Sequence, residues 1–155
     1  MKKRFAMMLA ALGAALAACT PTRMPGPRTE TLGQPAVPQA VTTLDGYKEE
    51  LARRISNANA SLVYGGRPQA FLRSVIVVKF SVDASGKLLR SDIIRGNHDS
   101  TTEATALASL RSSAPFPRPA AQLLKHGRVE ISETWLFNAD GRFQLRSIAE
   151  PQMTE

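Results

Sequence analysis

The spacing of apolar residues predicts two helices in the second part of the chain. Over residues 45–62 they recur at steps of three and four, which is typical of an amphipathic helix. Asp45 is expected to cap this helix, and Gly65-Gly66 to lie beyond its end. A second helix is expected to begin near Ser100 and to end before the proline-rich stretch at residues 115–119. Its inward-facing residues are predicted to be Ala104, Leu107, Ala108 and Leu110.

Period-two alternation predicts strands. The first is expected at residues 72–82, with one face made of Ile76, Val78, Phe80 and Val82. A turn that ends at Gly86 joins it to a second strand at Lys87–Arg95, which makes a hairpin. A third strand is expected at Val129–Phe137, where Glu133 interrupts an otherwise apolar face, and Arg142–Ile148 is expected to add a short fourth.

The order of these elements defines the fold class. A helix, a hairpin, a second helix and a further strand or hairpin predict an α+β domain. We therefore expect a small antiparallel sheet with two packed helices over residues 44–148, followed by a tail at 149–155. Trp135 and Phe137 are interpreted as core residues of this sheet.

The first 18 residues are typical of a secretory leader. A basic start is followed by an uncharged, alanine-rich run from Phe5 to Ala18, which is too short to cross a bilayer as a helix. The run ends in Leu16-Ala17-Ala18-Cys19, which resembles the lipobox of bacterial lipoproteins. Residues 1–18 are therefore predicted to be a lipoprotein signal peptide, and Cys19, the only cysteine, to be lipidated. An ordinary signal peptide cleaved after Ala18 is the alternative.

A linker is expected between the leader and the domain. Residues 19–43 carry five of the ten prolines among Thr, Gly, Gln and Ala, with hardly any apolar periodicity. Such a segment can hold the domain away from the membrane to which Cys19 anchors it.

The net charge of +7 changes the picture little. Lys2, Lys3 and Arg4 lie in the leader, and their removal takes away three charges and leaves +4. The remaining arginines are scattered and lack interleaved aromatic residues, which favours a solvated basic surface over nucleic-acid binding.

Few residues suggest catalysis or metal binding. Asn97-His98-Asp99-Ser100 contains the residue types of a catalytic triad, but consecutive loop residues do not converge on one point. A polar turn in which Asp99 or Ser100 caps the following helix is the favoured interpretation. His126 has no Cys or carboxylate at ligand spacing. We expect no enzyme activity, no metal and no cofactor.

Several of these motifs together resemble the C-terminal domain of TonB and TolA proteins. They are Val75-x-Val77-x-x-Phe80-x-Val82, the turn at Gly86, an alanine-rich helix, Pro115-Phe116-Pro117-x-Pro119 and Trp135-x-Phe137. The resemblance covers residues 47–140. It implies a protein-binding domain that takes part in energy-dependent transport at the outer membrane. The inner-membrane helix and long spacer of the family are replaced by a lipoprotein leader and a short linker.

The resemblance also implies a binding site. In the family, a partner segment adds to the edge of the strand that corresponds to Val129–Phe137. The candidate partner-binding residues are Val129, Glu130, Ile131, Ser132, Glu133, Thr134 and Trp135. Glu133 and basic neighbours such as Arg128 are expected to bias which peptides fit. The alternative is that Arg142–Ile148 already covers this edge.

The sequence thus predicts a lipoprotein of the bacterial envelope that faces the periplasm. Its lipid anchor is expected in the outer membrane, and its partners are expected to be envelope proteins, including peptides of outer-membrane receptors. A structural or assembly lipoprotein of an envelope complex is the alternative function.

Overall fold

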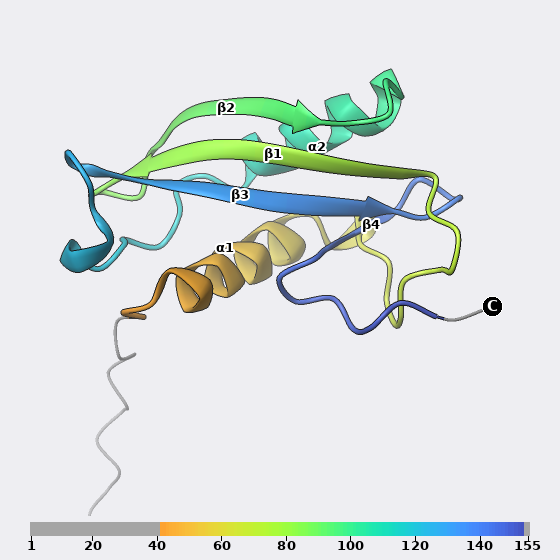
Figure 1. The fold of residues 1–155 in the computed structure, drawn as a ribbon, viewed down its shortest axis with the longest axis horizontal. Helices are drawn as coiled ribbons and strands as arrows, with labels where there is room; N and C mark the ends of the chain where they lie inside the picture. Colours follow the sequence, from red (N-terminus) through yellow and green to blue (C-terminus); the bar gives the residue numbers. More distant parts are fainter. Residues whose placement is uncertain (1–40, 154–155) are drawn as a thin grey trace, which may run out of the picture. The chain divides into compact units, whose positions relative to one another are not determined.

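The computed structural model describes residues 41–153, so the expected leader, Cys19 and most of the linker lie outside the described residues. Figure 1 shows one sheet packed against two helices. The elements are α1 (Leu44–Ala58), η1 (Ala60–Leu62), β1 (Ser74–Asp83), β2 (Leu88–Arg95), α2 (Ser100–Ser112), η2 (Ala121–Leu123), β3 (Arg128–Phe137) and β4 (Phe143–Leu145). The predicted α+β class is confirmed.

The sheet is antiparallel, with strand order β2-β1-β3-β4. β1 and β3 pair along their whole length, from Ser74 opposite Phe137 to Asp83 opposite Arg128, without a register shift. α2 packs against β1 and β2, and α1 packs against β3, β4 and α2. The helices therefore cover one face of the sheet, which we call the core face. We call the opposite, uncovered face the solvent face.

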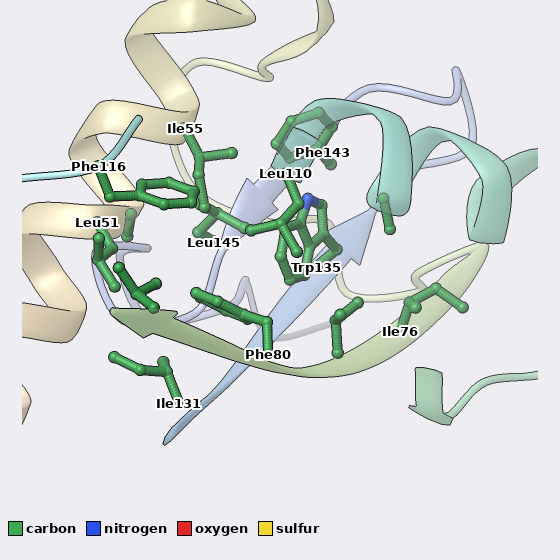
Figure 2. Close-up of a cluster of buried hydrophobic side chains, with 14 of the residues drawn as sticks. Leu51, Ile55, Ile76, Phe80, Leu110, Phe116, Ile131, Trp135, Phe143 and Leu145 are labelled. Carbon is green, nitrogen blue, oxygen red and sulfur yellow. The ribbon is translucent and has the colours of Figure 1, made fainter. Parts of the chain in front are cut away.

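The core face confirms the predicted period-two pattern of β1. Its four predicted core residues are buried, as are Trp135 and Phe137 of β3. Figure 2 shows Phe80, Leu110 and Trp135 pointing into the space between sheet and helices. The Trp135 indole N–H donates a hydrogen bond to the Ser109 hydroxyl (3.0 Å), so even its polar atom is satisfied within the core.

Both ends of α1 differ from the prediction. Thr43, not Asp45, caps the N-terminus, because the Thr43 hydroxyl accepts from the Gly46 N–H (3.2 Å). The helix ends at Ala58 and not at residue 62. Asn59 ends it by donating through its side-chain amide to the carbonyl oxygens of Ile55 (2.8 Å) and Ser109 (3.1 Å).

The buried face of α2 was predicted partly wrongly. Ala104 and Ala108 are exposed, whereas Leu110 is buried and Leu107 packs against the core as expected. Polar contacts set the rotation of this helix. The Thr102 hydroxyl donates to the Ser74 hydroxyl (3.0 Å), and Ser109 receives the Trp135 indole, so both turn inward.

The turn between β1 and β2 packs against the segment that follows α2. Gly86 has φ of +90°, and the Phe116 N–H donates to its carbonyl oxygen (2.8 Å). This contact brings the Phe116 ring onto Phe80, with 6.1 Å between the ring centroids.

Gly86→Ala is expected to destabilise the domain by about 1–3 kcal/mol. The Ala would adopt a positive φ, and its Cβ would collide with the Phe116 carbonyl oxygen. Chemical denaturation measures the change, and Gly65→Ala is the matched control because a Cβ there meets no atom within 4 Å. Equal stability of the two variants would contradict the tight contact between Gly86 and Phe116.

Residues of the segment that follows β4 make hydrogen bonds to the loop before β1. Residues 149–153 were assigned to a tail, but the Met153 N–H donates to the Pro68 carbonyl oxygen (3.0 Å). The Gln152 amide donates to the carbonyl oxygens of Gln69 and Ala70, each at 2.6 Å. This segment therefore lies along the loop that leads into β1.

Candidate protein-binding edge

The Asn97–Ser100 segment has a structural role. Asp99 caps α2 by accepting from the N–H groups of Thr101 (3.1 Å) and Thr102 (3.2 Å), and it pairs with Arg73 at 2.8 Å. The Arg73 guanidinium, by its hydrogen bond, holds the pKa of Asp99 below its usual value. The Asn97 side chain accepts from the Ser74 hydroxyl (2.6 Å). These contacts confirm the predicted cap and use the polar groups for folding.

Within residues 41–153, no three His, Cys, Asp or Glu side chains are grouped closely enough to hold a metal ion. His126 has a positive φ of 52° in the turn before β3. The same part of the chain contains no helix long and apolar enough to cross a membrane.

β3 is covered by β1 along one edge but only partly along the other. β4 pairs with Trp135, Leu136 and Phe137 alone. The fourth strand is shorter than the predicted Arg142–Ile148, because the chain turns away after Leu145. The N–H groups of Ile148 (3.0 Å) and Ala149 (2.9 Å) both donate to the Leu145 carbonyl oxygen in this turn.

Hydrogen bonds at the end of β4 show which residues of β3 point outward. The Asn138 N–H donates to the Arg142 carbonyl oxygen (2.9 Å), and the Arg146 N–H donates to the Thr134 carbonyl oxygen (3.0 Å). Because backbone groups alternate between the two edges of a strand, Glu130 and Ser132 also direct their N–H and C=O groups outward. The backbone groups of Ile131 and Glu133 are directed toward β1.

The two outward-facing residues are available for pairing. Glu130 and Ser132 are exposed, and among residues 41–153 no backbone or side-chain hydrogen bond is formed by their outward groups. We call residues 129–133 the open edge. At about 3.4 Å per residue it spans roughly 17 Å, enough for a short added strand. The alternative in which Arg142–Ile148 covers the whole edge is therefore wrong for this segment.

A pocket lies at the first end of the open edge. The N–H of Lys125 donates to the carbonyl oxygen of Arg128 (2.8 Å), which places the turn before β3 beside the outer edge. A cavity of about 460 Å³ opens there, which we call the Leu44 pocket. Leu44, Leu123 and Val129 line it with apolar atoms, and its remaining lining residues are Gln122, Lys125, His126, Arg128 and Glu130.

Glu133 lies at the other end of the open edge, on the core face. Its side chain is only 3% exposed and lies opposite Val78 of β1. One carboxylate oxygen, Oε1, accepts from the outward-facing N–H of Thr134 (2.6 Å). Its other oxygen, Oε2, is buried and accepts no hydrogen bond from the described residues. The predicted interruption of the apolar face is thus a buried acid that leans toward the edge.

The remaining candidate residues divide between the two faces. Val129 and Ile131 are buried in the core, so they contribute backbone and packing rather than exposed side chains. Trp135 does not belong to the available edge, because it is fully buried and pairs with Leu145 of β4. Thr134 is occupied as well, its N–H by Glu133 and its carbonyl oxygen by Arg146.

Charges flank the open edge on the solvent face. Glu130 pairs with Lys79 (3.0 Å) and, more loosely, with Arg128 (3.9 Å). The hydrogen bond from the Lys79 ammonium, followed by its charge, holds the pKa of Glu130 below its ordinary value. Glu130 is therefore ionised and already paired at neutral pH. Oε2 of Glu133, by contrast, has no hydrogen-bond partner among the described residues.

The outer edge of β2 is less suited to strand addition. Its pairing with β1 has irregularities between Val77 and Val78 and between Ser81 and Val82. Irregularities of this kind, together with the exposed charges of Arg90, Asp92 and Arg95, discourage pairing with a further strand. β3 has no such irregularity, so the structure favours its open edge.

Comparisons with known proteins found no matching protein-family model, no similar curated protein and no similar solved structure. The resemblance to the TonB and TolA C-terminal domains therefore rests on the sequence motifs and stays a prediction.

Proposed function

We propose that this chain is a periplasm-facing lipoprotein of the bacterial envelope that binds an extended segment of another envelope protein. The segment adds to the sheet as a strand beside β3. The open edge carries the proposal, because its outward N–H and C=O groups at Glu130 and Ser132 can form the hydrogen bonds of an added strand. In this proposal the domain acts as a binding module and not as an enzyme.

The sequence motifs support a more specific role. The strand used for partner binding in TonB and TolA proteins corresponds to β3. The Phe-Pro-x-Pro motif packs against the β1–β2 turn through Phe116. We therefore propose a relative of the energy transducers of outer-membrane transport, with a lipid anchor at Cys19. A peptide of an outer-membrane receptor is the corresponding partner.

One observation favours a second candidate, a structural or assembly lipoprotein. β4 already occupies β3 from Trp135 onward, so the remaining edge accepts only a short segment. A short contact of this kind is suited to one element of a larger interface with an envelope complex.

Site-specific cross-linking tests partner binding at this edge. A photoreactive residue at Ser132 is expected to cross-link an envelope protein in whole cells, and mass spectrometry is expected to map the link to an extended segment. The same residue at Ser91 in β2 is the matched control. Equal cross-linking from both positions, or none from Ser132, would overturn binding at the open edge.

Cys19→Ser is expected to leave unprocessed precursor without acyl chains. Lipidation needs the cysteine thiol, and no other cysteine is present to replace it. Intact-mass measurement of the wild-type protein should show a mature N-terminus at Cys19 that carries lipid. A wild-type N-terminus without acyl chains would contradict the lipoprotein assignment.

Thr20, which follows the cysteine, favours sorting of the lipoprotein to the outer membrane. Membrane fractionation that recovers the protein solely from the inner membrane would contradict this expectation.

A further inference from the structure

The open edge ends at a buried carboxylate oxygen that the described residues leave without a donor. Oε2 of Glu133 is buried, while Oε1 is held by the Thr134 N–H at 2.6 Å. Burying a carboxylate oxygen without a hydrogen bond is costly, and a positively charged donor offsets that cost best. No Lys or Arg side chain among the described residues forms an ion pair with Glu133.

One oxygen of the Glu133 carboxylate, Oε1, lies on the side of β3 where an added strand would run. The Thr134 N–H points to the outer edge of β3, so the Glu133 carboxylate that accepts from it bends to the same side. In a sheet, the side chain opposite Glu133 on the added strand lies on the same face, with its Cβ about 5 Å away. A long side chain at that position extends along the same face as the carboxylate.

The Leu44 pocket gives the second contact. Val129, in its lining, and Glu133 lie on the same core face of β3 and are four residues apart. Their opposite positions on an added strand are therefore also four residues apart and share a face. An apolar side chain suits the part of the pocket that Leu44, Leu123 and Val129 line.

We infer that the open edge selects an extended segment that carries a Lys or Arg and an apolar residue four positions apart. The basic residue pairs with Glu133, and the apolar residue enters the Leu44 pocket. In the antiparallel orientation that β4 adopts at this edge, the basic residue comes first. The inference rests on the proposed strand addition and defines the chemistry of its partner.

A tethered strand tests the inference without a known partner. The full chain carries, after Glu155, a Gly/Ser linker of about 20 residues, whose r.m.s. reach is about 25 Å, and a strand of Thr and Val. The strand contains Lys and, four positions later, Leu. In one control strand Met replaces Lys, which keeps the length of the side chain but removes its charge. In a second control strand Lys and Leu are three positions apart, which puts them on opposite faces.

Amide hydrogen exchange at Glu130 and Ser132 is the measurement. The Lys strand is expected to slow exchange at both amides at least about tenfold more than the Met strand or the strand with a spacing of three. Glu133→Gln retains an acceptor for the Thr134 N–H. In this variant the Lys strand is expected to slow exchange less than about twofold more than the Met strand does. Glu130→Gln removes an exposed carboxylate of the same strand and is expected to preserve the difference between the Lys and Met strands.

The outcomes separate the inference from the proposed function. If Lys and Met strands protect both amides equally, strand addition stands and selection by Glu133 is overturned. If no strand protects either amide, the proposed function is overturned together with the inference. Comparison of Lys with Met in the wild-type chain needs no substitution in the domain, so the result does not depend on how Glu133→Gln folds.

Discussion

Phe80→Ala is expected to lower the free energy of unfolding by about 3–5 kcal/mol. Phe80 is 2% exposed and packs on Phe116, with 6.1 Å between the ring centroids. Its removal leaves a cavity between the sheet and the segment after α2, and it loosens the contact that holds the β1–β2 turn. Because a domain of this size is stable by only about 5–15 kcal/mol, a large part of the folded population is lost at elevated temperature.

Phe71→Ala is the matched control for this prediction. Phe71 lies shortly before β1 in the same chain but is 76% exposed, so the same chemical change removes little packing. Its effect is expected to stay within about 0.5 kcal/mol. Urea denaturation followed by circular dichroism measures both. A midpoint for Phe80→Ala as high as that of Phe71→Ala would show that β1 turns its other face to the core.

The strands were the most predictable part of the fold. Alternation along β1 determines which side chains are buried, because one face meets two helices and the other meets water. The turn at Gly86 was also predictable, because its positive φ favours glycine. Both signals are local, so a single sequence contains them.

The buried face of α2 was less predictable for a physical reason. Apolar periodicity favoured Ala104 and Ala108, but the helix turns Thr102 and Ser109 inward instead. Their hydroxyls bond to Ser74 and Trp135, which lie far away in the sequence. A polar residue that is satisfied by a distant partner cannot be distinguished from a solvent-exposed one by spacing alone.

The extent of the open edge could not be predicted either. It depends on where the chain leaves β3 after Leu145, which is determined by contacts on the other side of β4. There the Tyr64 N–H donates to the Phe143 carbonyl oxygen (2.9 Å), and the Gln144 amide donates to the Tyr64 carbonyl oxygen (2.8 Å). These contacts join distant segments. The sequence indicated Glu133 as an interruption of the strand, but not that its carboxylate leans toward the edge.

Likewise, sequence analysis missed the Leu44 pocket. Its walls come from the start of α1, the short η2 turn and the start of β3. None of these residues forms a motif. Leu44 belongs to the apolar series of α1, and its exposure beside the edge follows only from the packing of the helix against β3.

Ser132→Pro is expected to reduce partner binding at least tenfold, equivalent to about 1.4 kcal/mol, while the domain stays folded. The Ser132 N–H points outward, so proline removes a donor that only an added strand uses. Its ring also projects into the space that the added backbone would occupy. Binding is measured with the protein that was cross-linked through Ser132, or with the tethered Lys strand by exchange at the Glu130 amide, and circular dichroism reports the fold.

Two further proline variants separate loss of binding from loss of structure. Ser91→Pro places proline on the outer edge of β2. The Asp83 N–H bonds to the Lys87 carbonyl oxygen, so alternation along β1 directs the backbone groups of Phe80 away from β2, and those of its partner Ser91 point outward. This variant is expected to fold and to bind normally. Ile131→Pro removes an N–H that faces β1, so it is expected to unfold the domain.

Full binding by a folded Ser132→Pro variant would rule out strand addition at the open edge and favour the structural lipoprotein. Loss of binding with a normal fold in Ser132→Pro alone would assign the contact to the N–H group of one residue.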